Sequence, residues 1–169
     1  MFVERPELTA ELHELARAAC IELLRAYGVE LTLSPDEWTE SDEITLSGVM
    51  GFVGPKVRGT CLFAASREVL TAAAPPSAKL RDWVGELANQ LVGRIKSKLI
   101  ARGATISLST PVVLSGVRWS PLPRTSGRPV LFSADAGILL VWLEAEIDSD
   151  FEFQPVTELL ANEGEFLVF

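Results

Sequence analysis

The chain has 169 residues, of which 48% are hydrophobic and 22% charged, a composition typical of a folded domain and not of a disordered segment. Its net charge of −8 argues against binding to nucleic acid, which needs clustered Lys and Arg, and against an anionic membrane surface. No apolar run approaches the ~18 residues that span a bilayer, and the first residues lack the layout of a signal peptide. We therefore expect one cytoplasmic domain over residues 1–169, with Cys20 and Cys61 reduced in its core.

The first predicted helix covers residues 6–27. Pro6 suits the first turn of a helix, leucines recur behind it at helical spacing, and Gly28 predicts the helix end. Residues 29–33 then alternate like a strand, and the acidic segment 34–43 is expected to be a loop.

A hairpin of two strands is predicted next. Its strands cover residues 44–53 and 56–65, and the chain turns between them at Gly54 and Pro55. A short helical turn over residues 67–74 follows and ends before two prolines.

The longest predicted helix begins after Ser77, which we expect to cap it, and runs to Arg102 before stopping at Gly103. A strand, a proline-rich loop, two hairpin strands and a short tail helix follow it. The ordered elements of this second half are expected at residues 105–115, 130–133, 138–147 and 156–162. This order predicts an α+β fold in which an antiparallel sheet is packed with two main α-helices.

The long helix carries a distinctive polar face. Glu86 and Asn89 lie four and seven residues after Asp82, and both fall within about 40° of Asp82 around a helix. The opposite stripe of the same helix is apolar and consists of Leu80, Val84, Leu87, Leu91, Ile95 and Leu99. We therefore expect this helix to bury one face and to present the other, a rigid row of polar groups, to another macromolecule.

Other candidate sites have less support. His13 is the only histidine, and with two distant cysteines it cannot form a zinc site, so a solvated position on the first helix is expected. Residues 51–56 lack the spacing of a phosphate loop, and Pro55 removes a backbone donor there. The acidic segment 34–43 lacks the residue order of an EF-hand, and no Gly-x-Ser-x-Gly elbow supports acyl transfer.

Pro111 extends the helix pattern. The sequence reads Asp82, three residues, Glu86, two residues, Asn89, twenty-one residues, Pro111, and this closely resembles the signature of the CheC/CheX family of chemotaxis phosphatases. Gly93, one turn past the amide, matches a small residue usual in that family. The resemblance extends loosely over residues 29–143 and includes the glycine-bearing paired strands before the long helix, at residues 46–48 and 59–62.

The number of motif copies distinguishes two arrangements in that family. CheC-like chains tend to carry two copies, whereas CheX-like chains carry one and form dimers. Asp36, Glu40 and Glu43 share the spacing, but they put a carboxylate where the amide is needed. The resemblance therefore implies a single CheX-like domain and a homodimer.

The resemblance also implies an activity, hydrolysis of the aspartyl phosphate on a CheY-type response regulator in two-component or chemotaxis signalling. Glu86 and Asn89 would be its catalytic residues, with Asn89 orienting the attacking water and Glu86 pairing with a lysine of the partner. Asp82, Glu86 and Gly93 would bind the partner. No cofactor and no metal site are expected in this chain, because the Mg²⁺ would be held by the response regulator.

Two other hypotheses remain open. The chain could be a non-catalytic module of the same fold that docks on a receiver or on a flagellar-switch component. It could also be a structural α+β dimer unrelated to signalling. A merely structural helix has no need of Gly93, which costs roughly 1 kcal/mol of helix stability relative to alanine, or of an amide at Asn89.

Overall fold

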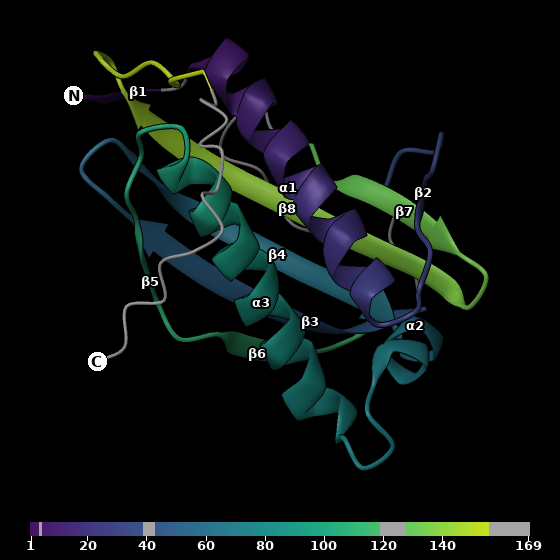
Figure 1. Ribbon diagram of the computed structural model, residues 1–169. Helices are drawn as coiled ribbons and strands as arrows, with labels where there is room; N and C mark the ends of the chain where they lie inside the picture. Colours follow the sequence, from purple (N-terminus) through teal and green to yellow (C-terminus); the bar gives the residue numbers. More distant parts are fainter. Residues whose placement is uncertain (4, 39–42, 119–127, 156–169) are drawn as a thin grey trace, which may run out of the picture.

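The computed structural model describes residues 1–3, 5–38, 43–118 and 128–155. Its centre is an antiparallel sheet with strands in the order β2-β7-β8-β4-β3-β5, to which β1 adds beside β8 and β6 beside β3 (Figure 1). The strands are β1 (Phe2–Val3), β2 (Thr32–Leu33), β3 (Ile44–Val53), β4 (Val57–Ser66), β5 (Ser107–Leu108), β6 (Val112–Ser115), β7 (Val130–Ala134) and β8 (Gly137–Asp148). The predicted α+β fold is confirmed.

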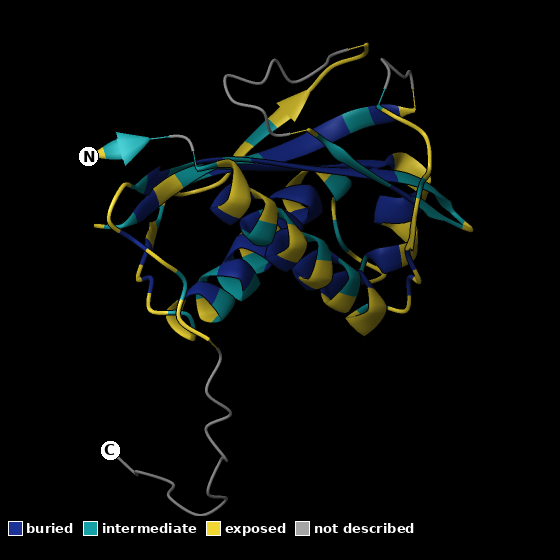
Figure 2. Ribbon diagram, turned by 90° about the horizontal axis from the view of Figure 1, so that it is seen from above, coloured by how far each residue is buried: buried dark blue, intermediate teal, exposed yellow. Residues whose placement is uncertain are grey.

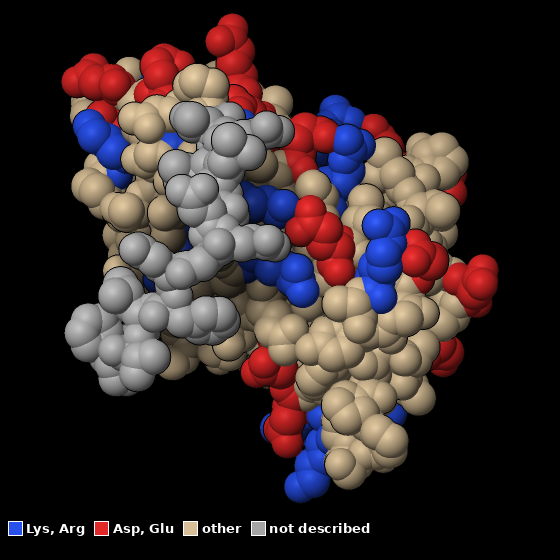
Figure 3. All heavy atoms as spheres, viewed as in Figure 1, with Lys and Arg blue, Asp and Glu red and all other residues tan. Residues whose placement is uncertain are grey.

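The described helices all cover one face of the sheet (Figure 2). They are α1 (Pro6–Ala26), α2 (Arg67–Ala73) and α3 (Leu80–Ile100). Helices α1 and α3 run antiparallel across the sheet, and acidic and basic side chains interleave along this side of the molecule (Figures 1 and 3). Two ion pairs join α1 to the C-terminal part of α3 and the residues just after it. Lys98 Nζ lies 2.8 Å from Glu22 Oε1, and Arg102 pairs with Glu11. None of the described helices is both long and apolar enough to cross a membrane.

Most predicted elements are present, with small shifts at their ends. Both predicted hairpins form, as β3–β4 and β7–β8, and Gly28 and Gly103 adopt the positive φ that ends a helix, +78° and +84°. The predicted strand over residues 29–33 is shorter, because only β2 pairs there. The predicted tail helix, residues 156–162, and part of the acidic segment and of the proline-rich loop lie outside the described residues.

Three expectations were wrong. Ser77 does not cap the long helix: α3 begins at Leu80 after Lys79, and no side chain caps it. The single strand over residues 105–115 is two strands, β5 and β6. The chain between them leaves the regular ladder at Ser109, whose Oγ accepts from the Gly51 N–H at 2.9 Å, and Pro111 just beyond has no N–H to donate.

The third correction concerns His13. Its ring is half-buried, and Nε2 lies 2.9 Å from the Leu143 carbonyl oxygen on β8, so the side chain ties α1 to the sheet and is not simply solvated. Cys20 and Cys61 are free and buried, as expected. Burial raises the pKa of the Cys61 thiol to about 12 and raises that of Cys20 as well, so both remain protonated packing residues.

Helix α3 lies unusually close to strand β3, and glycine makes this possible. A Cβ added to Gly48 would meet the Ala88 Cβ at 2.7 Å and the Val84 carbonyl oxygen at 3.0 Å. On the helix side, a Cβ added to Gly85 would meet the Val113 Cγ2 of β6 at 3.0 Å. The backbone of α3 is therefore fixed against β3 and β6, while its opposite face is left to solvent.

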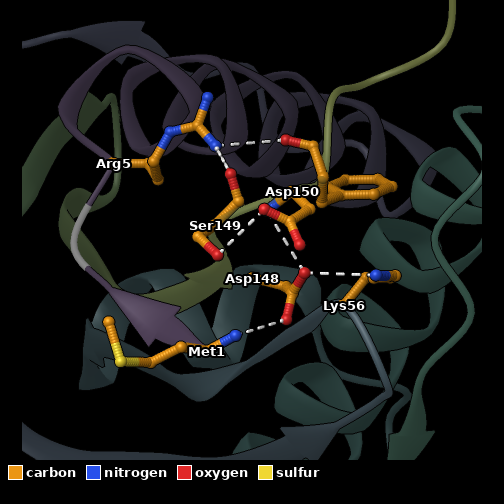
Figure 4. Close-up of polar contacts among 7 residues, drawn as sticks. Met1, Arg5, Lys56, Asp148, Ser149 and Asp150 are labelled. Atoms are coloured by element: carbon orange, nitrogen blue, oxygen red, sulfur yellow. Dashed lines mark hydrogen bonds and ion pairs between the residues drawn. The ribbon is translucent and has the colours of Figure 1, made fainter.

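The first strand is anchored by a charged cluster at the end of β8. Asp148 Oδ2 accepts from the N-terminal ammonium of Met1 at 3.1 Å, and Oδ1 accepts from Lys56 Nζ at 3.1 Å and from the Asp150 N–H at 3.3 Å (Figure 4). The ammonium, then the lysine, then the backbone donor stabilise the ionised carboxylate and lower the pKa of Asp148 to about 2.

Replacing Gly48 by alanine should destabilise the protein by about 1–3 kcal/mol, because neither the Ala88 side chain nor the helix backbone can give way cheaply. Gly93→Ala, on the helix that Gly48 faces, is the control, since its added Cβ would meet nothing within 4 Å. It should raise stability by up to about 1 kcal/mol through helix propensity. Urea unfolding midpoints of the two variants measure this, and a neutral Gly48→Ala would contradict the close packing.

Stability should also depend on pH through Asp148. Because its pKa in the folded protein lies below the ordinary value of about 3.9, the stabilisation is present at neutral pH and is lost as pH falls from about 4 to about 2. Asp148→Asn should therefore lower the melting temperature at pH 7, and its difference from wild type should shrink below pH 4. A difference that stays constant down to pH 2.5 would exclude this role.

Candidate functional site

The candidate site is the solvent face of α3. Its opposite side is buried against the sheet and α1 through Trp83, Val84, Gly85, Leu87, Ala88, Leu91, Val92, Ile95 and Leu99. Asp82, Glu86 and Asn89 are all exposed, and Gly93 is half-exposed one turn further on. The predicted polar face is confirmed: these four residues share one face of a helix whose backbone is held by the core.

Glu86 is held by a neighbour. Gln90, one turn later, donates from Nε2 to Glu86 Oε1 at 2.8 Å, so one of the two carboxylate oxygens has a fixed partner. Within the described ranges Glu86 forms no ion pair, and its side chain is exposed. This carboxylate is therefore oriented and available to a cation brought from outside.

Asn89 is the amide of the face. It lies three residues after Glu86 and is exposed, and in the described part of the chain no hydrogen bond to its side chain is found. A carboxamide offers an accepting oxygen and a donating NH₂ group, so one side chain can bind a water and an anionic oxygen together. The amide is free to bind an external ligand in this way.

Asp82 and Glu86 border a shallow hollow at the start of α3. The hollow has a volume of about 440 Å³, and Lys79 and the side of Trp83 complete its lining with Ser77 and Ala78. Asp82 stands in the first helical turn, where a negative charge also stabilises the helix through its dipole. Its position fits both this structural role and the predicted contact with a partner.

Gly93 has a different character from the glycines that pack inside the fold. An added Cβ would meet nothing within 4 Å, so no internal contact requires glycine here. Glycine in the middle of a helix is unfavourable by roughly 1 kcal/mol relative to alanine. The described structure therefore gives no internal reason for a glycine at this position.

Pro111 belongs to another part of the structure. It is exposed in the connection between β5 and β6, whereas the polar residues of the site all come from α3. The link is indirect: β6 begins one residue later, and its Val113 packs on Gly85 beneath the helix. Pro111 therefore lies at the start of a strand edge and not on the polar face of α3.

Two residues near the site escaped the sequence analysis. Gln90 could have been found, because it follows Glu86 by four residues and such pairs meet on a helix. Tyr27 could not, since it lies just past α1, yet its hydroxyl donates to Gln90 Oε1 at 2.8 Å. In the described part of the chain, no cluster of three His, Cys, Asp or Glu side chains is placed to hold a metal ion.

Comparisons with known proteins agree with this geometry. The family model for the chemotaxis phosphatase CheX matches residues 46–130, which include the whole of α3. The chemotaxis protein CheX from Vibrio vulnificus is 22% identical, the match covers 80% of this chain and 96% of that one, and the TM-score is 0.68. A comparison with curated proteins gave no match.

Two further solved structures share the fold. One is a CheX-CheY-BeF3-Mg²⁺ complex from Borrelia burgdorferi, with 18% identity over 78% of this chain and 96% of that one and a TM-score of 0.59. The other is the middle domain of FliM from H. pylori, with 10% identity over 83% of this chain and 92% of that one and a TM-score of 0.51. At these identities the neighbours establish the architecture alone.

Proposed function

The chain belongs to the CheX family of chemotaxis phosphatases, and from this membership and the geometry of α3 we propose that it hydrolyses the aspartyl phosphate of a CheY-type response regulator. The observation that carries the proposal is that Glu86 and Asn89 are both exposed on one face of a helix whose backbone is fixed by the core. Exposed polar side chains on a rigid helix can enter a site on another molecule.

In the proposed chemistry, this protein mainly positions the attacking water. A phosphoaspartate is an energetic mixed anhydride, and its hydrolysis chiefly needs a water placed in line with phosphorus. Asn89 would accept a hydrogen bond from that water through its side-chain oxygen and donate from its NH₂ to a phosphoryl oxygen. A carboxylate at this position would repel the phosphoryl oxygens, which gives a physical reason for an amide.

Glu86 has the docking role in this proposal. A carboxylate held one turn from the amide would pair with a lysine of the receiver and so fix the register in which Asn89 reaches the phosphoryl group. Asp82 would extend the contact along the same face. Gly93 would let the receiver approach the helix closely, which its open surroundings support.

The receiver would complete the catalytic site. Because Glu86 and Asn89 are exposed in this chain, the water-poor environment that strengthens polar interactions has to form when the partner covers them. The receiver would also hold the Mg²⁺ that neutralises the phosphoryl oxygens. The Borrelia burgdorferi structure, in which CheX occurs with CheY, BeF3 and Mg²⁺, supports this division of labour.

A second candidate is a non-catalytic module that docks on a receiver or on a flagellar-switch component. The fold shared with the FliM middle domain gives it some support, because the architecture by itself does not specify hydrolysis. The free amide at Asn89 favours the phosphatase, since docking alone does not require it.

We propose in addition that the chain forms a homodimer. The supporting feature is β6, which pairs with β3 and, within the described residues, with no other strand, so one edge is open. Val112 and Leu114 on this strand are 58% and 50% exposed. An open strand edge with exposed apolar side chains is suited to pairing with a second copy.

Asn89→Ala should lower the rate of phosphate release from a phosphorylated receiver by about 100-fold or more, the usual loss for a preorganised polar group in the transition state. Its affinity for a receiver activated with beryllofluoride should stay within about twofold of wild type. Glu86→Lys should weaken that affinity about tenfold or more, because it places a like charge against the receiver's lysine.

The matched control is Glu7→Lys, which changes the net charge equally but lies in the first turn of α1. Binding by calorimetry and label loss from the receiver separate the two effects. Full turnover by Asn89→Ala would refute the assigned mechanism, and a wild type that binds without accelerating phosphate loss would favour the non-catalytic module.

The homodimer is tested by the mass in solution. Light scattering after size-exclusion chromatography should give about twice the chain mass of 18.4 kDa at micromolar concentration. Leu114→Lys should shift the protein to a monomer, whereas Val53→Lys should not, because Val53 is 60% exposed but lies at the far end of β3. A monomeric wild type would exclude the proposed dimer.

A further inference from the structure

We propose that Tyr27 and Gln90 are positioning residues that hold the Glu86 carboxylate ready for the cation of the docking partner. This inference rests on the function proposed above, in which Glu86 makes the docking contact. It adds two residues that do not touch the partner's phosphoryl group and that belong to no part of the helix motif.

The contact runs from α1 to α3 in two steps. The Tyr27 hydroxyl donates to Gln90 Oε1 at 2.8 Å, and Gln90 Nε2 donates to Glu86 Oε1 at 2.8 Å. Tyr27 and Gln90 are half-buried, whereas Glu86 is exposed. The two half-buried side chains have less freedom to move than the exposed carboxylate, so they can restrict its movement.

Aromatic packing fixes the start of this chain of contacts. The ring of Tyr27 meets Trp83 edge-on, with ring centroids 5.0 Å apart and planes at 88°. Trp83 is only 8% exposed, so it provides a rigid wall for the tyrosine. The hydroxyl of Tyr27 is thereby held at a set place beside α3.

The hydroxyl gives the Gln90 amide a second anchor. The ionised Glu86 carboxylate only accepts, so it binds the NH₂ group of Gln90, and the amide oxygen is left to accept from the Tyr27 hydroxyl. Without the hydroxyl, Gln90 loses one of its two anchors, and Gln90 and Glu86 regain rotamer freedom that docking would have to remove. Ordering a side chain before binding removes that cost from the binding step.

A purely structural role for the same contacts is less well supported. Helices α1 and α3 are already joined near the other end of their contact by the Lys98–Glu22 and Arg102–Glu11 ion pairs. The ring contact of Tyr27 with Trp83 does not need the hydroxyl. Removing the hydroxyl alone should therefore leave the packing of the two helices intact while releasing Gln90.

The test measures affinity for a CheY-type receiver activated with beryllofluoride and Mg²⁺, together with kcat on the phosphorylated receiver. Tyr27→Phe and Gln90→Met should each raise Kd about three- to tenfold, the size expected for ordering one long side chain, and leave kcat within twofold. Glu86→Ala should raise Kd further, and adding Tyr27→Phe to it should have no additional effect.

Lys98→Met is the matched control, because it breaks another tie between the same two helices. It should lower the melting temperature slightly and leave Kd unchanged. If Glu86→Ala raises Kd but Tyr27→Phe and Gln90→Met do not, the positioning role is overturned and the proposed docking role of Glu86 stands. If Glu86→Ala leaves Kd unchanged, the docking role fails and the positioning role fails with it.

Discussion

The close packing of α3 on β3 and β6 is the constraint on which the rest of the structure depends. Gly48 and Gly85 remove the two side chains that would hold the helix away from the sheet, so backbone approaches backbone. With one face fixed in this way, the exposed face has a defined direction along its whole length. Side chains that must meet a partner in register can then be placed by helical spacing alone.

The same face combines ordered and open groups. The Glu86 carboxylate is oriented by Gln90, whereas Asn89 has a free side chain and Gly93 has open space around it. This division fits a CheX-family protein that supplies a positioned amide and a docking charge, and whose partner supplies the phosphoryl group and its metal. In the proposed function, the polar face of α3 is half of an active site, and the receiver supplies the other half.

Sequence patterns predicted the parts of this protein that depend on local periodicity. The two hairpins, α1 and the polar row on α3 all follow from side-chain spacing. Apart from the Ser77 cap, the wrong and missed expectations involve contacts between distant residues. The break at Ser109 depends on Gly51 across the sheet, His13 meets a carbonyl of β8, and Tyr27 reaches Gln90 from another helix. No local pattern contains such partners.

The central claim is that this chain removes the phosphoryl group from a receiver. The most direct measurement is the decay of phosphoryl label on CheY-type receivers, with and without the wild-type protein at catalytic amounts and with Mg²⁺ present. We expect at least one receiver to lose its label much faster, with multiple turnovers for each copy of the protein. An unchanged rate of label loss on every receiver that binds the protein would contradict the claim.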